Sequence, residues 1–373
     1  MSSTTQSFGD GRLSFFMRTA EPEPIRSPGS IERSDRYRSI LEQPTMDWWE
    51  RHQVIQRLGS GGQGVVFLCE RVGSDGFRLP VALKVFSPAR YDSDDLYDDA
   101  MIRMARVAVE VAHIQQDNLI DVHNVVSSGS IRVMEMEWVD GYDLSQLLTE
   151  ELYQRARSRV DDDRWAYIND VIMTTGARHP RFKPGIAIAI LRDALAALAA
   201  LHSGGIVHGD IKPSNMMLKR TGNAKLIDIG AAFRRDDPPP RVTCTPAFAA
   251  PEVLETGLTT PQSDLASLGY VLIEMLAGMS PFGDLTDYGE LKEAKQSLVD
   301  RIDELLPEEV ACNELLMSLV RGLIEPSPDQ RFPSAEAADL VEQGAANFQR
   351  QLIMGDLASE YDIEIRAWLN DLN

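Results

Sequence analysis

Apolar and polar positions alternate along the first half of the chain and change to a helical spacing in the second half. The strand-like runs occupy residues 52–72, 79–87, 119–128 and 130–139. Within this half, residues 100–116 have the spacing of an amphipathic helix. From Pro184 onwards, apolar residues recur every three or four positions, as in buried helices. The pattern therefore predicts an α+β fold with a small β-rich part followed by a larger helical part.

The two ends and one internal stretch depart from this pattern. Residues 1–47 are rich in Ser, Thr, Pro, Arg and Glu, which predicts a disordered extension. A regulatory arm phosphorylated near Ser27-Pro28 is the alternative to a passive tail. Residues 150–184 have few paired apolar positions and are interpreted as an extended insertion. It is either a binding surface for a partner or an insertion without a role of its own. Residues 346–373 alternate acidic and apolar positions, which predicts a docked helical tail.

Composition narrows the possible functions. The 373 residues carry 57 acidic and 37 basic side chains, and the formal charge of -20 repels nucleic acid and anionic membranes, so no nucleic-acid partner is expected. Three widely spaced cysteines form neither a disulfide framework nor a zinc-ligand pattern, so we expect a reducing, cytoplasmic location. Because Arg192 and Asp193 interrupt the most apolar stretch, no membrane span is predicted. The N-terminal residues, with Asp10 and Arg12, show no basic patch followed by an apolar core, so no export signal is predicted.

The chemistry concentrates in one polar loop between two short apolar runs. Asp210, Lys212 and Asn215 lie close together in this loop. Asp228 ends the following strand and is followed by the flexible Gly230. Such a loop can present one base, one cation and two metal ligands to a single small volume, which is what phosphoryl transfer requires.

A second set of candidate residues precedes the loop. Gly59, Gly61 and Gly64 lie between two strand-like runs, where they fit a plain tight hairpin as well as a cover over phosphates. Lys84 interrupts an apolar alternation, so its charge needs a partner unless it reaches solvent at a strand end. Glu110 is the only acidic residue of the helix-patterned stretch and the natural partner of Lys84, with a solvent-facing position as the alternative.

Five motifs in this order resemble the eukaryotic-like (Hanks-type) Ser/Thr protein kinases of bacterial type, from about residue 52 to 345. The motifs read GSGGQGVV, VALK, HGDIKPSN, DIG and APE. The resemblance implies a bilobal protein kinase-like fold, with a β-rich N-lobe over residues 48–139 and a helical C-lobe over 140–345. It also implies that ATP and Mg²⁺ are used to phosphorylate Ser/Thr hydroxyls of protein substrates, including the chain itself.

The resemblance assigns a role to each motif residue. Asp210 would accept the proton of the substrate hydroxyl, and Lys212 would steady the transferred phosphoryl group. Asn215 and Asp228 would hold Mg²⁺. The residues implied to bind ATP are Gly59, Gly61, Gly64, Val66, Ala82, Lys84, Glu110, Met136, Glu137, Trp138 and Asp143.

The resemblance also implies three structural residues in the helical lobe. Glu252 and Arg331 correspond to a buried ion pair, and Asp264 to a carboxylate that braces the catalytic loop.

Three departures from the family pattern stand out. Gly209 replaces the usual Arg before the catalytic Asp, so a pocket for a phosphorylated activation segment lacks its main basic member and the site is expected to work without that phosphate. Ile229 replaces the Phe of the metal-binding turn. Glu110 lies about three residues closer to the next strand than the family spacing places it, which leaves another partner open for Lys84.

Two other functions compete with a Ser/Thr kinase. The first is a pseudokinase-type nucleotide-binding scaffold, which the presence of Lys84, Asp210, Asn215 and Asp228 disfavours. The second is a small-molecule phosphotransferase. CTPAFAAPE disfavours it, because Thr245 stands where Ser/Thr kinases read a hydroxyl-bearing peptide. Substrate, pathway and oligomeric state are not predicted.

Overall fold

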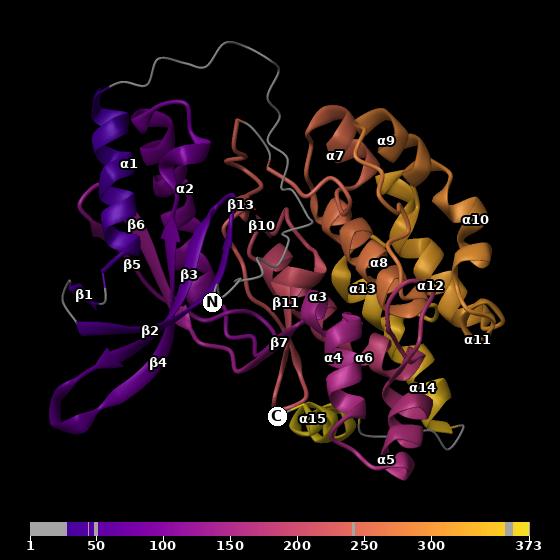
Figure 1. Ribbon diagram of the computed structural model, residues 1–373. Coiled ribbons are helices and arrows are strands. Elements are labelled where there is room, and N and C mark those ends of the chain that lie inside the picture. Colours follow the sequence, from indigo (N-terminus) through magenta and orange to yellow (C-terminus); the bar gives the residue numbers. More distant parts are fainter. Residues whose placement is uncertain (1–27, 44, 48–50, 241–242, 355–360, 373) are drawn as a thin grey trace, which may run out of the picture.

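The computed structural model describes residues 28–43, 45–47, 51–240, 243–354 and 361–372, and its first part is a β-rich lobe (Figure 1). A six-stranded antiparallel sheet runs in the order β1-β2-β3-β4-β6-β5. Its strands are β1 (Thr45–Asp47), β2 (Arg51–Gly61), β3 (Gly64–Val72), β4 (Arg78–Phe86), β5 (Val122–Ser128) and β6 (Ile131–Glu137). The strand, glycine loop and strand expected at the start of this lobe are therefore present.

Both faces of the sheet are covered. Ala82 and Leu83 are neighbours on β4 and lie in two different apolar clusters, because side chains alternate between the faces of a strand. α2 (Asp94–Ala112) packs in the cluster of Ala82, and α1 (Pro28–Leu41) contributes to that of Leu83. α2 begins where the Ser93 hydroxyl accepts a hydrogen bond from the third residue of the helix, so the acidic run is a helix N-terminus.

α1 corrects the prediction of a disordered extension over residues 1–47. Its Ile40 is 1% exposed in the outer apolar cluster. Arg33 is also buried, and its guanidinium contacts Asp98 at 3.0 Å and the Asp94 carbonyl at 3.1 Å. Figure 1 shows α1 beside α2. Composition did not reveal this helix because few of its side chains are buried, and one of those is an arginine. The rest of the predicted extension, residues 1–27, lies outside the described residues.

The second lobe is built around two apolar helices, α6 (Pro184–Ser203) and α8 (Pro261–Ala277), which pack against each other. The surrounding helices are α7 (Pro251–Thr256), α9 (Tyr288–Gln296), α10 (Leu298–Leu305), α11 (Glu308–Ala311), α12 (Glu314–Ile324) and α13 (Ala335–Leu340). By length and composition α6 is the one helix in the described part of the chain that could cross a membrane. However, 61% of its apolar window is buried inside the protein, as in a core helix.

The stretch interpreted as an extended insertion is largely helical. It contains α4 (Glu150–Arg157), α5 (Asp162–Tyr167), the π-helical turn η3 (Ile168–Ile172) and the short strands β8 (Met173–Thr174) and β9 (Arg181–Phe182). The tail forms α14 (Ala345–Met354) and α15 (Tyr361–Asp371). The Trp368 ring meets Phe182 edge to face at 6.0 Å, and Arg164 pairs with Asp371 at 3.0 Å. The insertion and the tail therefore stabilise each other.

Short elements between the lobes carry the polar loop. They are β7 (Gly141–Asp143), α3 (Leu144–Leu147), β10 (Ile206–Val207), β11 (Met216–Lys219), β12 (Ala224–Leu226) and β13 (Phe233–Arg234). β12, β11 and β7 form one small antiparallel sheet, and β10 pairs with β13 in another. The expected α+β architecture of two lobes is confirmed (Figure 1).

Candidate active site

One cavity of about 700 Å³ collects almost every residue predicted to act on ATP or on the transferred group. Its lining includes Gly59, Gly61, Gly64, Val66, Ala82, Lys84, Met136, Glu137, Trp138, Asp143, Asp210, Lys212, Asn215 and Asp228. Glu110 is the predicted residue that does not line it. The glycine hairpin, the link between the lobes and the polar loop thus face one volume large enough for a nucleotide.

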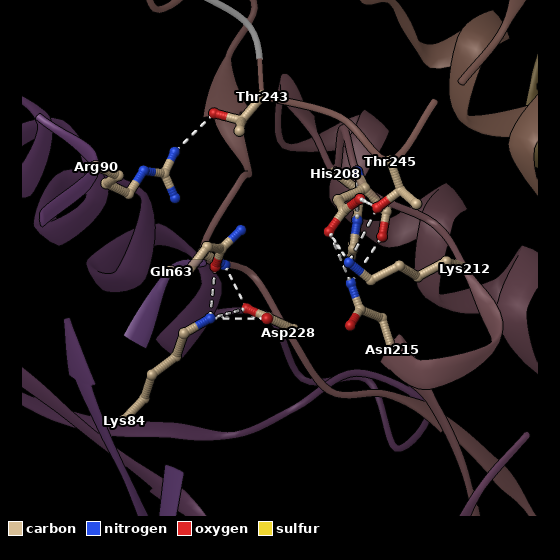
Figure 2. A network of polar contacts seen from close by, with 11 residues as sticks. Gln63, Lys84, Arg90, His208, Lys212, Asn215, Asp228, Thr243 and Thr245 are labelled. Atoms are coloured by element: carbon tan, nitrogen blue, oxygen red, sulfur yellow. Dashed lines mark hydrogen bonds and ion pairs between the residues drawn. The ribbon is translucent and has the colours of Figure 1, made fainter. Parts of the chain in front are cut away.

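The helical lobe contributes a compact hydrogen-bonded group, here called the Asp210 cluster (Figure 2). The Asp210 carboxylate accepts a hydrogen bond from Lys212 Nζ at 2.6 Å and another from the Thr245 hydroxyl at 2.8 Å. Lys212 also donates to the Thr245 hydroxyl at 3.1 Å. Asn215 donates to the Asp210 backbone carbonyl at 2.8 Å. A base, a cation and a hydroxyl are therefore already within hydrogen-bond reach of one another.

A buried carboxylate holds the backbone that carries this cluster. Asp264, which is 1% exposed, accepts hydrogen bonds from the backbone N–H groups of His208 and Gly209, each at 2.9 Å. Gly209 has a φ of +76°, in the left-handed region that favours glycine. His208 is fully buried, and this burial lowers its pKa. Its Nδ1 accepts the N–H of Asp210 at 3.3 Å, so the neutral ring helps to fix the loop. The expected brace by Asp264 is present.

The ion pair expected in the helical lobe is also formed. The Glu252 carboxylate accepts two hydrogen bonds from the Arg331 guanidinium, at 2.6 and 2.8 Å. Arg331 is 4% exposed. Glu252 lies in the APE motif, at the end of the segment that begins at Asp228 and is here called the activation segment. The pair therefore ties the end of this segment to the loop before α13.

A second group, the Lys84 cluster, joins Lys84 and Gln63 of the β-rich lobe to Asp228 of the helical lobe. Lys84 Nζ donates to the two Asp228 oxygens at 2.6 and 2.7 Å and to Gln63 Oε1 at 2.6 Å (Figure 2). Burial alone would raise the pKa of Asp228, but the Lys84 ammonium and the N–H of Gly230 outweigh it and lower the pKa to about 2. Asp228 is therefore ionised at neutral pH.

Two glycines allow the Lys84 cluster to close. Gly64 has a φ of +149°, and a Cβ there would lie 2.0 Å from the Val85 carbonyl oxygen. A Cβ on Gly230 would lie 2.2 Å from Gln63 Oε1 and 2.7 Å from Lys84 Nζ. Any side chain at either position would push the hairpin tip or the ammonium away.

Glu110 is not the partner of Lys84 in this structure, which corrects the expected pair. Its carboxylate instead bonds the guanidinium of Arg234 on β13, which also binds Asp236 at 2.7 Å. β13 packs against α2, so Arg234 is nearer to Glu110 than the Lys84 ammonium is. The irregular spacing of Glu110 in the sequence left this outcome open.

Sequence reasoning missed Gln63, Arg90 and Arg234. Arg90, just after β4, donates to the Thr243 hydroxyl at 2.7 Å and so links the β-rich lobe to the activation segment. Gln63 lies within the glycine loop, where its position could have suggested contact with a ligand. The contacts of Arg90 with Thr243 and of Arg234 with Glu110 give no local signal, because each joins residues more than a hundred positions apart in the sequence.

The wall that would face a base and ribose is partly apolar and partly acidic. Met136 is 6% exposed on β6, opposite Ala82 on β4. Asp143 caps α3 by accepting the Gln146 N–H at 3.0 Å, and burial raises its pKa. The Glu137 carboxylate accepts hydrogen bonds from Lys225 and from the backbone N–H of Asp121, just before β5. Met136, Ala82 and Asp143 are therefore the wall side chains most suited to a nucleoside.

Asn215 and Asp228 fit a magnesium ion. They supply an amide oxygen and an ionised carboxylate, and Mg²⁺ prefers such oxygen ligands. Asn215 Nδ2 is committed to Asp210, which leaves its carbonyl oxygen as the atom for a cation. Among the described residues no group of three or more His, Cys, Asp or Glu side chains could hold a metal ion. A magnesium site does not need such a group, because phosphate and water oxygens usually complete the coordination shell of the ion.

Comparison with known proteins agrees with this geometry. The family described as "Protein kinase domain" matches residues 52–341, more than half of the chain. "Serine/threonine-protein kinase PknL" of Mycobacterium bovis is 30% identical over 249 residues, which cover 66% of this chain and 53% of that protein. "Serine/threonine-protein kinase PkaB" of Streptomyces coelicolor is 30% identical over 247 residues, 62% of this chain and 50% of that protein.

A third relative extends the same pattern. "Serine/threonine-protein kinase PrkC" of Bacillus subtilis is 28% identical over 239 residues, 62% of this chain and 31% of that protein. The chain thus spans about half or less of the length of these curated relatives. α1, α14 and α15 lie outside the residues that the family match covers.

Proposed function

The chain belongs to the protein kinase family, and we propose that it is a Ser/Thr protein kinase that transfers the γ-phosphoryl group of ATP to proteins. The observation that carries this proposal is the Thr245 hydroxyl, which donates to Asp210 at 2.8 Å while Lys212 binds both groups. A substrate hydroxyl needs the same distance from its base. The curated relatives with Ser/Thr kinase names support the same activity.

The reaction follows from the Asp210 cluster. The substrate hydroxyl oxygen attacks the γ-phosphorus, a new O–P bond forms and the bond to the bridging oxygen of ADP breaks. Asp210 accepts the hydroxyl proton, and the ADP oxygen takes the electron pair of the broken bond. Lys212 stays beside the attacking oxygen, where its charge stabilises the negative charge on the transferred group. For the substrate to enter, the Thr245 hydroxyl gives up its contact with Asp210.

Magnesium is the metal implied by this proposal. Asn215 and Asp228 would hold it, and when bound it would neutralise charge on the β- and γ-phosphates. Lys84 would bind the α- and β-phosphates, so its ammonium leaves Asp228 for the nucleotide. Asp228 would then be released from Lys84 to act as a metal ligand, with its carboxylate facing Mg²⁺ in place of the ammonium.

A scaffold without catalysis is the weaker alternative. Such a protein needs neither the Asp210–Lys212 contact nor a buried brace beneath it, yet both are present. Nothing in the described residues removes a group that phosphoryl transfer needs. The cavity, the base and the cation are retained together.

The proposal is tested by phosphate transfer from labelled Mg-ATP to the protein itself or to a basic Ser/Thr-containing protein. Asp210→Asn should reduce incorporation by about 10²- to 10⁴-fold, because the amide cannot accept the proton. Asp303→Asn is the control: within the described part of the chain this carboxylate pairs only with exposed Arg321, so the variant should keep the wild-type rate. Equal label incorporation by wild type and Asp210→Asn, with unchanged urea unfolding, would contradict the assignment of Asp210 as the base.

A further inference from the structure

Lys295 on α9 has an unusual environment for a lysine. The residue is 0% exposed, and its ammonium lies 3.7 Å from the ring centre of Phe282 and 4.2 Å from that of Tyr270. Among the described residues, no carboxylate forms an ion pair with it. Lysine is almost never fully buried without a charged partner, so this position calls for a specific reason.

The reason is a single hydrogen bond to the activation segment. Lys295 Nζ donates to the backbone carbonyl of Ala247 at 2.7 Å. Ala247 lies inside a tight turn, in which the N–H groups of Phe248 and Ala249 both donate to the Thr245 carbonyl, at 2.9 and 3.0 Å. The Thr245 side chain in turn contacts Asp210. Lys295 therefore holds the turn that begins at Thr245, and the Thr245 side chain contacts the catalytic base Asp210.

Packing alone does not account for this lysine. Tyr270 and Phe282 meet edge to face at 5.0 Å, so the two rings already fix each other. An apolar side chain of similar length would fill the space between them without burying an amine. Burial lowers the pKa of Lys295, yet the amine donates a hydrogen bond in either protonation state. The group that an apolar residue could not replace is the donor to Ala247.

We propose that Lys295 is a positioning residue for the protein substrate. It holds the turn of residues 245–249 so that a bound Ser or Thr presents its hydroxyl to Asp210. This inference rests on the proposed kinase function, in which that turn lies beside the peptide. Lys295 does not touch ATP or the reacting atoms, so it acts only through the turn.

Steady-state kinetics with a basic Ser/Thr-containing protein as substrate give the first test. Lys295→Met should raise KM for the protein by about tenfold, since a small misplacement beside the reacting hydroxyl is costly. KM for ATP should stay unchanged. Lys295→Gln retains an N–H donor and should recover part of the loss. Lys292→Met is the matched control, because Lys292 lies on the same helix, is partly exposed and pairs with Glu255.

Hydrogen exchange gives the second test and needs no substrate. The amides of Phe248 and Ala249 should exchange at least about tenfold faster in Lys295→Met, while the amides of α8 keep their protection. Unchanged exchange at both amides, or a Lys295→Met enzyme with wild-type KM for the protein, would overturn the inference. If the wild type phosphorylates no protein, the proposed function fails, and exchange at these two amides still decides whether Lys295 supports the turn of residues 245–249.

Discussion

The two halves of the active site differ in how ready they are for transfer. The Asp210 cluster already joins base, cation and hydroxyl at hydrogen-bond distances. In the Lys84 cluster, by contrast, the ammonium is engaged by Asp228 and Gln63 (Figure 2). Glu110, outside this cluster, is paired with Arg234. The Asp210 cluster thus keeps its base and cation together within the helical lobe, whereas the proposed nucleotide binding requires the Lys84 cluster, which joins both lobes, to exchange ionic partners.

The way each lobe is held together explains the difference. α6 and α8 are buried among apolar side chains, and a packed core has few alternative arrangements. Both lobes also contain ionic contacts, since Glu135 pairs with His52 in the β-rich lobe and Glu252 pairs with Arg331 in the helical lobe. The Lys84 cluster differs because its ion pair joins the two lobes. An ion can change partner by rotating a side chain, so this cluster can rearrange without repacking either lobe. The fixed group therefore lies within the helical lobe, and the convertible group joins the two lobes.

The largest expected stability effect concerns Glu135 in the β-rich lobe. Burial would raise the pKa of Glu135, but His123, His52 and Arg71 outweigh it and lower the pKa to about 2 from 4.5. A lowered pKa stabilises the fold above pH 4.5, and this contribution is lost as the pH falls from about 4.5 to about 2. Glu135→Gln should therefore cost on the order of 2–3 kcal/mol at pH 7 in urea unfolding, and the gap to wild type should shrink in acid.

Glu309 supplies the matched control in the helical lobe. Arg181 and Lys183 pair with it, and its side chain is 39% exposed. Its pKa is also lowered, because these two cations outweigh the effect of burial. Glu309→Gln should change stability far less, since solvent screens an exposed ion pair. A gap for Glu309→Gln as large as that for Glu135→Gln would contradict the contrast between the lobes.

A smaller effect is expected at the junction of α1 and α2. Arg33→Ala removes hydrogen bonds to Asp98 and to the Asp94 carbonyl and the packing of the guanidinium on the Tyr97 ring. The loss should be about 1.5–3 kcal/mol in urea unfolding, with faster hydrogen exchange in α2.

The control for Arg33 lies on the same helix. Arg38 is exposed and pairs only with Asp35 in the described part of the chain, so Arg38→Ala should stay within about 0.5 kcal/mol of wild type. Equal losses for the two variants would mean that α1 is not anchored through Arg33.

The sequence predicts those parts of the site that belong to local motifs. Lys84, Asp210, Asn215 and Asp228 reach one cavity as expected, because short strands and a tight loop dictate where each side chain lies. The sequence could not predict which charged side chains form ion pairs with one another. The contact of Glu110 with Arg234 depends on how two distant segments pack, and the irregular spacing of Glu110 was its one hint.

The same limit applies to the fold. The alternation of the strands and the apolar spacing of α6 and α8 were sufficient to predict two lobes. α1 was missed because its buried positions include the charged Arg33, which looks solvent-exposed in a sequence. Lys295 was missed for a similar reason, since a lysine on a polar helix gives no sign of burial between two rings.

The central claim is that the Lys84 cluster exchanges partners before transfer, with the Lys84 ammonium leaving Asp228 and Gln63 for the nucleotide. The KM for ATP of Gln63→Ala tests it most directly, because this substitution removes one hydrogen bond that holds the ammonium in the cluster. Gln63→Ala should lower the KM for ATP by up to about fivefold, the value of one hydrogen bond. An unchanged or raised KM for ATP would contradict the exchange.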